Sequence, residues 1–334
     1  MLNQLKVTAI IPFKTDSSRP DLKERVKALA GECVFQGFSV IVVQHTENGE
    51  KPIELNDSIK KSVNLLTYSD NSIFNLSKAR NIGLKSCDSE WCIFLDADLV
   101  LPKQFSVGLE RLFSSNIVAS ETFFLTLPVV YVSENVPVSK LQLAENFGEF
   151  VCGDIPIDHW VLGSSVIVAR SKYLKKLGGY CELYRGWGYE DHDMAMHLVS
   201  RDSTFITPRK SHLFDPRPMQ SLSRYVGWRA KYALYGRLAT MYNLFLLHAY
   251  HSKNTYFSGS SFVSNNLQTF VKRSKALVFP SFEEVKFHPG HPIYSQYHLF
   301  FEQAKKGRLI ATIRDFLLRK NRVVRAYRKI MRIE

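Results

Sequence analysis

Two consecutive strand–helix–strand patterns in the first hundred residues constrain the fold of this chain more than any other feature. Short β-branched runs bounded by polar residues predict strands, and apolar residues at helical spacing between them predict helices. The expected elements are a strand at Val7–Ile11, a helix at Asp21–Leu29, a strand at Ser39–Val43, a strand at Leu65–Tyr68, a helix at Asn75–Lys85 and a strand at Trp91–Leu95. This alternation favours an α/β fold with a parallel sheet.

Polar or ligand-competent residues stand at the carboxyl ends of three of these strands. They are Phe13 with Lys14, Gln44 with His45, and Asp96 with Asp98. Open parallel sheets bind ligands at this edge, so we expect these residues to face one site.

The pair Asp96 and Asp98 ends an apolar strand and would present two carboxylates together. Carboxylate oxygens suit a divalent cation. An Asp-x-Asp pattern is weak by itself, because the chain has a second one at Asp191 and Asp193. The alternative interpretation is a solvated turn after the strand.

The segment Gly186-Trp187-Gly188-Tyr189-Glu190-Asp191 is more specific. Its two glycines let backbone approach a ligand, and the indole between them offers a flat face for a sugar. The two acids would lie in the first turn of a helix, whose dipole stabilises carboxylates, so either is a candidate general base. An acidic helix start with a buried tryptophan is the alternative.

Two further sets of residues are weaker candidates. His212 follows a predicted strand, and with Asp98 it would form an oxygen and imidazole site suited to manganese. Phe74 just before the helix predicted at Asn75–Lys85 would stack on a base, and Lys78 and Arg80 within it would contact phosphates. A structural or exposed histidine and a solvated cationic helix face are the alternatives.

The later part of the chain has a mixed pattern followed by a helical one. We expect a strand at Val166–Ala169, a helix at Ser171–Leu177, a loop at Gly178–Tyr189, a helix at Glu190–Ser200, a strand at Thr204–Thr207 and helix across Leu222–Ala249. A polar break over residues 252–266 precedes a basic end.

Charge and composition narrow the class of protein. The chain carries 44 Lys and Arg against 31 Asp and Glu, a net charge of +13, which favours an anionic partner. Five cysteines without a Cys-x-x-Cys pair fit a reducing compartment. The apolar run Val7–Pro12 is too short for a signal or spanning segment. We therefore expect a cytoplasmic protein, or one peripheral on the cytosolic face of the inner membrane.

Residues 305–334 hold eleven Lys and Arg against two acids. Apolar residues at helical spacing would leave these cations on one face, which is typical of an interfacial helix on an anionic membrane. A helix packed on the core and a contact with an acidic polysaccharide are the alternatives.

Taken in order, these motifs resemble those of the GT-A glycosyltransferases, specifically family 2 and the β-1,4-galactosyltransferases. The resemblance covers roughly residues 7–215. The segments that carry it are Ile10–Lys14, Phe74–Gly83 with its Ser-x-Ala-Arg-Asn-x-Gly form, Phe94–Leu99, Gly163–Ala169 and Gly186–Asp191.

The resemblance implies an α/β GT-A fold and a role for each matching residue. A catalytic domain would span 1–215, with a nucleotide-binding half (1–100) and an acceptor half (101–215), and a helical basic extension would span 216–334. The nucleotide-sugar would contact Pro12, Phe13, Lys14, Gln44, Phe74, Lys78, Arg80, Asp96 and Ala97. The sugar and acceptor pocket would include Gly163, Arg185, Gly186 and Trp187. Asp96, Asp98 and His212 would bind Mn²⁺ or Mg²⁺, and Asp191 with Glu190 would be catalytic.

The implied reaction is inverting transfer of a hexose or N-acetylhexosamine from a UDP-sugar to an oligosaccharide or glycolipid, in bacterial capsule or lipopolysaccharide synthesis. Lys14, Leu76 and Arg185 depart from the galactosyltransferase pattern. The smaller Val161, in the place of a tyrosine, would leave room for an N-acetyl group. One alternative is a basic nucleic-acid-binding protein, which no recognised motif supports. The other is a GT-A fold that only binds glycans.

Overall fold

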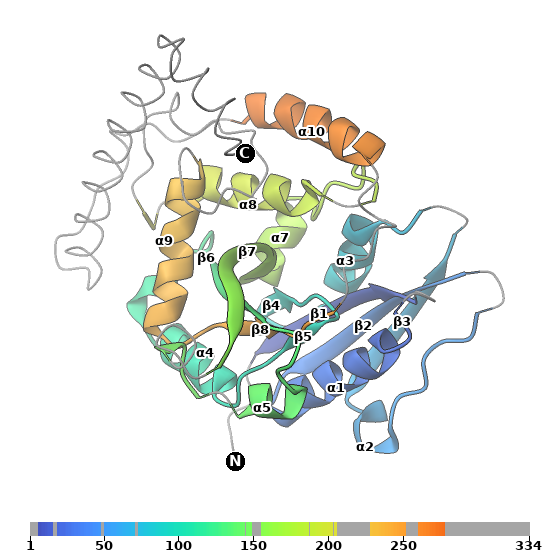
Figure 1. Cartoon of the computed structure of the whole chain (residues 1–334). Helices are drawn as coiled ribbons and strands as arrows, with labels where there is room; N and C mark the ends of the chain where they lie inside the picture. Colours follow the sequence, from blue (N-terminus) through green and yellow to red (C-terminus); the bar gives the residue numbers. More distant parts are fainter. Residues whose placement is uncertain are drawn as a thin grey trace, which may run out of the picture.

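The structure is a computed structural model (Figure 1), and it describes residues 6–15, 19–47, 50–70, 73–143, 145–148, 155–186, 188–202, 204–205, 228–251 and 260–277. The structural statements below concern these residues. The predicted basic segment 305–334 lies outside them.

One mixed sheet of eight strands organises the described part of the chain, in the order β3-β2-β1-β4-β7-β6-β8-β5. The strands are β1 (Val7–Lys14), β2 (Ser39–Thr46), β3 (Val63–Ser69), β4 (Trp91–Phe94), β5 (Leu99–Val100), β6 (Phe124–Val132), β7 (Ile157–Arg170) and β8 (Leu246–His248). The first four run parallel. This confirms the predicted parallel opening, which places three strand ends at one edge.

Helices cover both faces of the parallel half (Figure 1). Helix α1 (Leu22–Phe35) and helix α3 (Leu76–Lys85) lie on opposite sides of β1 and β2. Asn75 caps α3 because its side-chain oxygen accepts the Lys78 backbone N–H at 3.0 Å. The close approach of α3 requires a glycine at position 83, since an added Cβ would lie 2.4 Å from the Ile10 side chain.

The second half of the sheet is largely antiparallel. Strand β7 pairs antiparallel with both β4 and β6, and β8 runs parallel to β6 and antiparallel to β5. The short elements around this half are α2 (Asp57–Lys60), α4 (Phe105–Phe113), η1 (Asn116–Ala119), α5 (Val138–Gln142) and α7 (Ser171–Lys176).

Three helices build a layer beyond β6 and β7. Helix α9 (Trp228–Met241) packs on β6, α8 (Glu190–Arg201) packs on α9, and α10 (Ser260–Lys275) lies outermost against α8. None of the described helices combines the length and hydrophobicity needed to cross a bilayer.

Two sequence predictions for this region fail in part among the residues that the structure describes, and residues 206–207 of the second lie outside them. The expected helix across Leu222–Ala249 is helical at 228–241, but it then gives way to strand β8. Strand β8 forms because β6 and β5 offer it backbone partners on both sides. At the expected strand Thr204–Thr207, the described residues Thr204 and Phe205 form a bend. The chain after residue 216 therefore contributes a strand to the main sheet as well as helices.

Strand β8 separates two environments by the alternation of its side chains. Leu247 and the following Ala249 join a small apolar cluster with Val100, Val130 and Phe245. His248 consequently emerges on the opposite face of the sheet, where the residues of the site lie.

Candidate active site

A row of rings crosses the sheet beside the end of β8. Tyr131 of β6 is in register with His159 of β7 on one side and His248 of β8 on the other. Its ring stacks on both, with centroid distances of 4.5 Å to His159 and 4.3 Å to His248. His251 follows at 5.0 Å from His248. The register of three strands thus fixes the position of His248.

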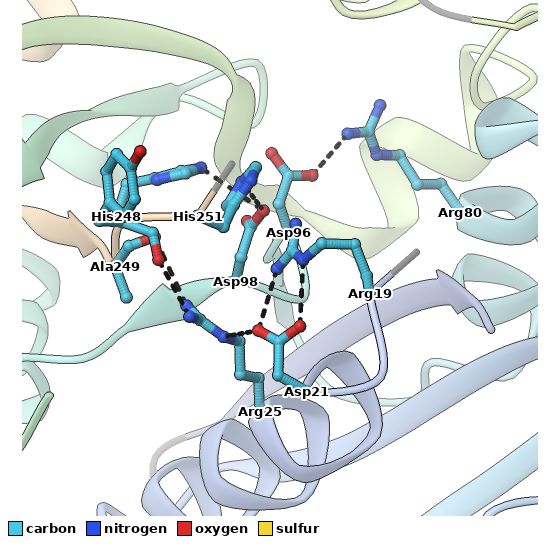
Figure 2. Close-up of polar contacts among 10 residues, drawn as sticks. Arg19, Asp21, Arg25, Arg80, Asp96, Asp98, His248, Ala249 and His251 are labelled. Atoms are coloured by element: carbon cyan, nitrogen blue, oxygen red, sulfur yellow. Dashed lines mark hydrogen bonds and ion pairs between the residues drawn. The ribbon is translucent and has the colours of Figure 1, made fainter. Parts of the chain in front are cut away.

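Two histidines face Asp98 at the end of this row (Figure 2). Nε2 of His251 lies 3.0 Å from Oδ2 of Asp98, and Nε2 of His248 lies 3.4 Å from the same oxygen. Burial works to raise the pKa of Asp98, but hydrogen bonds and charge from the two histidines hold it well below its ordinary value. Asp98 is therefore an anion held between two imidazoles.

The chemistry of these three groups fits a divalent transition cation. The ligand atoms of Asp98, His248 and His251 all lie within 4.8 Å of one another. Two atoms bound at about 2.1 Å to one ion are separated by roughly 3.0–3.5 Å, which matches the distances from the Asp98 oxygen. A donor set with two imidazoles suits manganese, iron or zinc better than magnesium or calcium.

Arg80 joins the carboxylate of Asp96, at the end of β4, to Glu190 at the start of α8. Its side chain is fully buried, and it donates to Oδ1 of Asp96 at 3.1 Å and to Oε1 of Glu190 at 3.4 Å. Burial and the charge of Asp191 raise the pKa of Glu190 to about 7, against the opposing charge of Arg80. Arg80 thus holds α3, the end of β4 and the start of α8 together.

The two predicted catalytic acids lie in the first turn of α8, as expected. Tyr189 caps this helix with a φ of 74°, and Gly188 precedes it with a φ of 105°, so the chain enters the helix through left-handed backbone. Glu190 is buried, whereas the side chain of Asp191 is 19% exposed. Asp191 is thus the more accessible of the two acids.

Asn266 of α10 holds both sides of the loop before α8. Its Nδ2 donates to the backbone oxygens of Arg185 at 2.8 Å and Gly188 at 3.0 Å, and its Oδ1 accepts the Arg185 N–H at 3.2 Å. Trp187 lies outside the described residues.

The negative charges of both acidic motifs act on the phenol of Tyr131. Burial and then the negative charges of Asp96, Asp98 and Asp191 raise its pKa above the ordinary value. Charges from the β4–β5 turn and from α8 therefore both act on this phenol.

A second polar cluster lies at the ends of β2 and β3, on the nucleotide-binding half predicted from sequence. The ring of Phe74 lies 5.8 Å from that of His45, which in turn lies 4.9 Å from Tyr68. Asp70 accepts a hydrogen bond from Lys78 at 2.6 Å and lies 3.1 Å from Nε2 of His45. Within the described residues, Nδ1 of the buried His45 has no hydrogen-bond partner.

The remaining nucleotide-site candidates are mostly inward-facing. Pro12 and Phe13 are buried in β1, and Lys14 forms an ion pair with Glu47 at 2.7 Å. Gln44 has no exposed surface, and its Oε1 accepts the Ile53 backbone N–H at 2.8 Å. Ala97 lies in the turn between Asp96 and Asp98. Their contacts with a nucleotide stay predictions.

The acceptor-site candidates are spread more widely. Gly163 lies inside β7, where an added Cβ would be 2.9 Å from Val129. The exposed Arg185 turns back onto the backbone oxygens of Glu182 and Tyr184. At Gly186, φ is 60° and the ring of Phe262 from α10 packs closely. The roles predicted for these residues also stay predictions.

Sequence reasoning missed Tyr131, His248 and His251. The predicted metal ligand His212 lies outside the described residues. A signal for the histidines was present, because the apolar run Leu244–Leu247 ends in two histidines three residues apart. In the same way, the apolar run before Asp96 is followed by the ligand-competent residues Asp96 and Asp98.

Comparison with known proteins identifies the class to which this fold and site belong. The model of the family described as glycosyltransferase like family 2 matches residues 8–266, which is more than half of the chain. The chain belongs to glycosyltransferase family 2 and is a glycosyltransferase with a GT-A fold, as its motifs predicted. The galactosyltransferase-like interpretation of Gly186–Asp191 stays a prediction.

Solved structures show more distant similarity. S. aureus TarS 1–349 is 16% identical, with a TM-score of 0.35, over 57% of this chain and 54% of that one. The catalytic domain of Drosophila β1,4-galactosyltransferase 7, in complex with xylobiose, is 16% identical, with a TM-score of 0.30, over 56% and 58%. The chain thus spans little more than half of either structure. A search of curated proteins found no match.

Proposed function

We propose that this glycosyltransferase is a metal-dependent inverting enzyme that transfers a hexose or N-acetylhexosamine from a UDP-sugar to a glycan hydroxyl. The observation that carries the proposal is the contact of the buried Arg80 with both motifs: it donates to Asp96 at 3.1 Å and to Glu190, the neighbour of Asp191, at 3.4 Å. This supports one site that combines a cation at the strand end with a candidate base on α8, an arrangement that suits a single displacement at a sugar carbon.

Asp191 is the proposed base. Its carboxylate lies at the positive end of the α8 dipole, accepts the backbone N–H of His192 at 2.8 Å and stays partly exposed. It removes the proton of the acceptor hydroxyl as that oxygen bonds to the anomeric carbon and the bond from this carbon to the UDP oxygen breaks. Inversion follows from this single attack.

Asp98, His248 and His251 are the proposed cation ligands, with His248 and His251 in the place expected for His212. A divalent cation held there would supply positive charge next to the diphosphate leaving group. The pairing of Asp98 with imidazoles favours Mn²⁺ over Mg²⁺ in the proposal.

The cluster of His45, Tyr68, Phe74 and Lys78 is the proposed site of the nucleoside. It lies at the carboxyl ends of parallel strands, where α/β folds bind nucleotides. The unpartnered Nδ1 of His45 and the ring of Phe74 supply a polar atom and an apolar face. The motif resemblance points to uracil as the base.

The acceptor and cellular setting rest on the motif resemblance. We propose an oligosaccharide or glycolipid acceptor in bacterial capsule or lipopolysaccharide synthesis, with residues 305–334 attaching the enzyme to an anionic membrane surface. Binding of the full chain to vesicles of neutral and anionic lipid, with and without those residues, tests the attachment.

The decisive experiment measures UDP release from a panel of UDP-sugars by the full chain, with Mn²⁺, with Mg²⁺ and with EDTA. We expect one sugar to be preferred, activity with Mn²⁺ and none with EDTA. Release that is equal in EDTA would contradict the metal dependence, and no release from any UDP-sugar would contradict the donor class.

Two variants separate the proposed roles. Asp98→Asn should abolish both Mn²⁺ binding and transfer. Asp191→Asn should retain donor binding and slow transfer about 100- to 10,000-fold. Asp88→Asn, at an exposed position on the opposite edge of the sheet, is the matched control and should behave as the wild type. An Asp191→Asn rate within tenfold of the wild type would assign the base to another group.

A further inference from the structure

The backbone between the two histidines is held by an arginine from a distant helix (Figure 2). Arg25 of α1 donates from one guanidinium nitrogen to the Ala249 oxygen at 3.4 Å and from the other to the Tyr250 oxygen at 3.0 Å. Ala249 and Tyr250 are the two residues that separate His248 from His251. One side chain thus grips both peptide carbonyls of the connection.

The arginine is itself fixed in place. Its Nε donates to Oδ2 of Asp21 at 2.5 Å, and Asp21 also accepts from Arg19 at 3.2 Å and 3.4 Å. The side chain of Arg19 is 9% exposed. Because a guanidinium is planar and bonds through several N–H groups, this arrangement determines where its two outer nitrogens point.

The histidine connection depends on this contact because the sheet ends just before it. Strand β8 stops at His248. The Ala249 N–H then donates one further hydrogen bond, at 3.3 Å, to the backbone carbonyl oxygen of Asp98. His251 lies beyond both. Arg25 bonds to the two carbonyls of the connection and so helps to fix the direction in which the chain reaches His251.

We propose that Arg25, oriented by Asp21, is a positioning residue for the cation site and keeps His248 and His251 aimed together at Asp98. The inference rests on the proposed function, since it assigns Arg25 a part in the same site. Arg25 touches neither the reacting atoms nor the cation. Its loss should therefore weaken cation binding and leave turnover at saturating cation largely unchanged.

The test is direct binding of Mn²⁺ to the full-length protein, measured from the electron paramagnetic resonance signal of free Mn²⁺, with the metal alone and with UDP. We expect Arg25→Gln to weaken Mn²⁺ binding about 10- to 100-fold, as loss of groups that orient metal ligands does. Arg25→Lys should recover part of the loss. The rate at saturating Mn²⁺ should stay within about twofold of the wild type.

Lys27→Gln is the matched control on the same helix. Lys27 pairs with Glu24 at the surface at 2.7 Å, so its loss should leave Mn²⁺ binding unchanged. Asp21→Asn retains Arg25 but weakens its anchor, and it should show a smaller loss in the same direction. If circular dichroism shows that Arg25→Gln does not fold, the Mn²⁺ affinity of Asp21→Asn tests the proposal instead.

The outcomes are distinguishable. If Arg25→Gln and Asp21→Asn bind Mn²⁺ as the wild type does while Asp98→Asn does not, the positioning role is overturned and the proposed function stands. If the wild type binds no Mn²⁺ in either condition, both are overturned. A lower melting temperature with unchanged Mn²⁺ affinity also overturns the inference, because it shows a purely structural contact.

Discussion

Arg80 donates a hydrogen bond to Asp96 over 3.1 Å although the arginine side chain has no exposed surface. The same guanidinium reaches Glu190 at 3.4 Å. An arginine predicted to contact a nucleotide therefore also links the strand-end carboxylate to the acids of α8. The geometry of both motifs depends on this one buried cation.

Replacing Arg80 by glutamine should destabilise the protein by about 3 kcal/mol, because it leaves buried Glu190 without its compensating charge. Transfer should fall as well, since the β4 end and α8 are no longer joined. Unfolding in urea measures the stability change. Lys27→Gln removes a surface ion pair and should change stability by less than about 1 kcal/mol. An equal effect of the two substitutions would contradict the importance of the buried link.

Glu190 should make stability depend on pH in a defined direction. Its folded pKa of about 7 lies above the ordinary 4.5, so between these values the folded protein holds a proton that the unfolded chain has lost. The free energy of unfolding contributed by Glu190 is fully present below about pH 4.5 and falls as pH rises through 7. The total fall is about 3 kcal/mol.

Comparison with Glu190→Gln isolates this contribution, because the amide does not titrate. Urea unfolding of both proteins from pH 4 to pH 8 should give a difference that grows in favour of the variant by about 3 kcal/mol. Parallel stability curves across this range would show that Glu190 does not carry the proton.

Loss of the Tyr131 ring should loosen His248. An aromatic contact contributes about 0.5–1.5 kcal/mol beyond burial, so Tyr131→Leu should raise the Mn²⁺ concentration for half-maximal activity about 2- to 12-fold. Tyr131→Phe retains the stacked ring and should leave this Mn²⁺ concentration nearly unchanged. If both variants raise it equally, the hydroxyl rather than the ring is responsible.

Removal of the Asn266 side chain should free the loop before α8. Asn266→Ala deletes three hydrogen bonds to the backbone of Arg185 and Gly188 and should destabilise the protein by about 2 kcal/mol. The KM for the acceptor should rise, as initial-rate kinetics would show. Its exposed neighbour gives the control, Asn265→Ala, expected to stay within about 0.5 kcal/mol.

The parallel half of the fold could be predicted because its local signals agree with its tertiary structure. The runs Val7–Ile11 and Trp91–Leu95 are apolar and β-branched or aromatic, and polar turn residues bound them. Every element predicted in the first hundred residues is present. Asp96, Asp98, Glu190 and Asp191 lie at the ends of elements as predicted, because each stands at the boundary of a strongly patterned element, and their functional roles stay predictions.

The proposed cation ligands beyond Asp98 could not be derived in this way. Residues 244–248 lie in a stretch rich in Arg, Tyr, Leu and Ala, whose local preference is helical. Strand β8 arises from pairing with β6 and β5, which are distant in sequence. The apolar run before His248 marks the two histidines as candidates, but their position beside Asp98 depends on that pairing, which the local pattern does not show.

Because β8 lies far after its partner β5 in the chain, the proposed cation site is completed late in translation. The ribosome releases Asp98 well before either imidazole, so a nascent chain that stops before residue 246 holds the parallel strands, Asp98 and Asp191 but lacks the two proposed histidine ligands. The proposed cation site is therefore complete only once residue 251 has been made. A product truncated before β8 would keep the parallel strands of the sheet but lack the two histidines, and we expect it to be inactive in metal-dependent transfer.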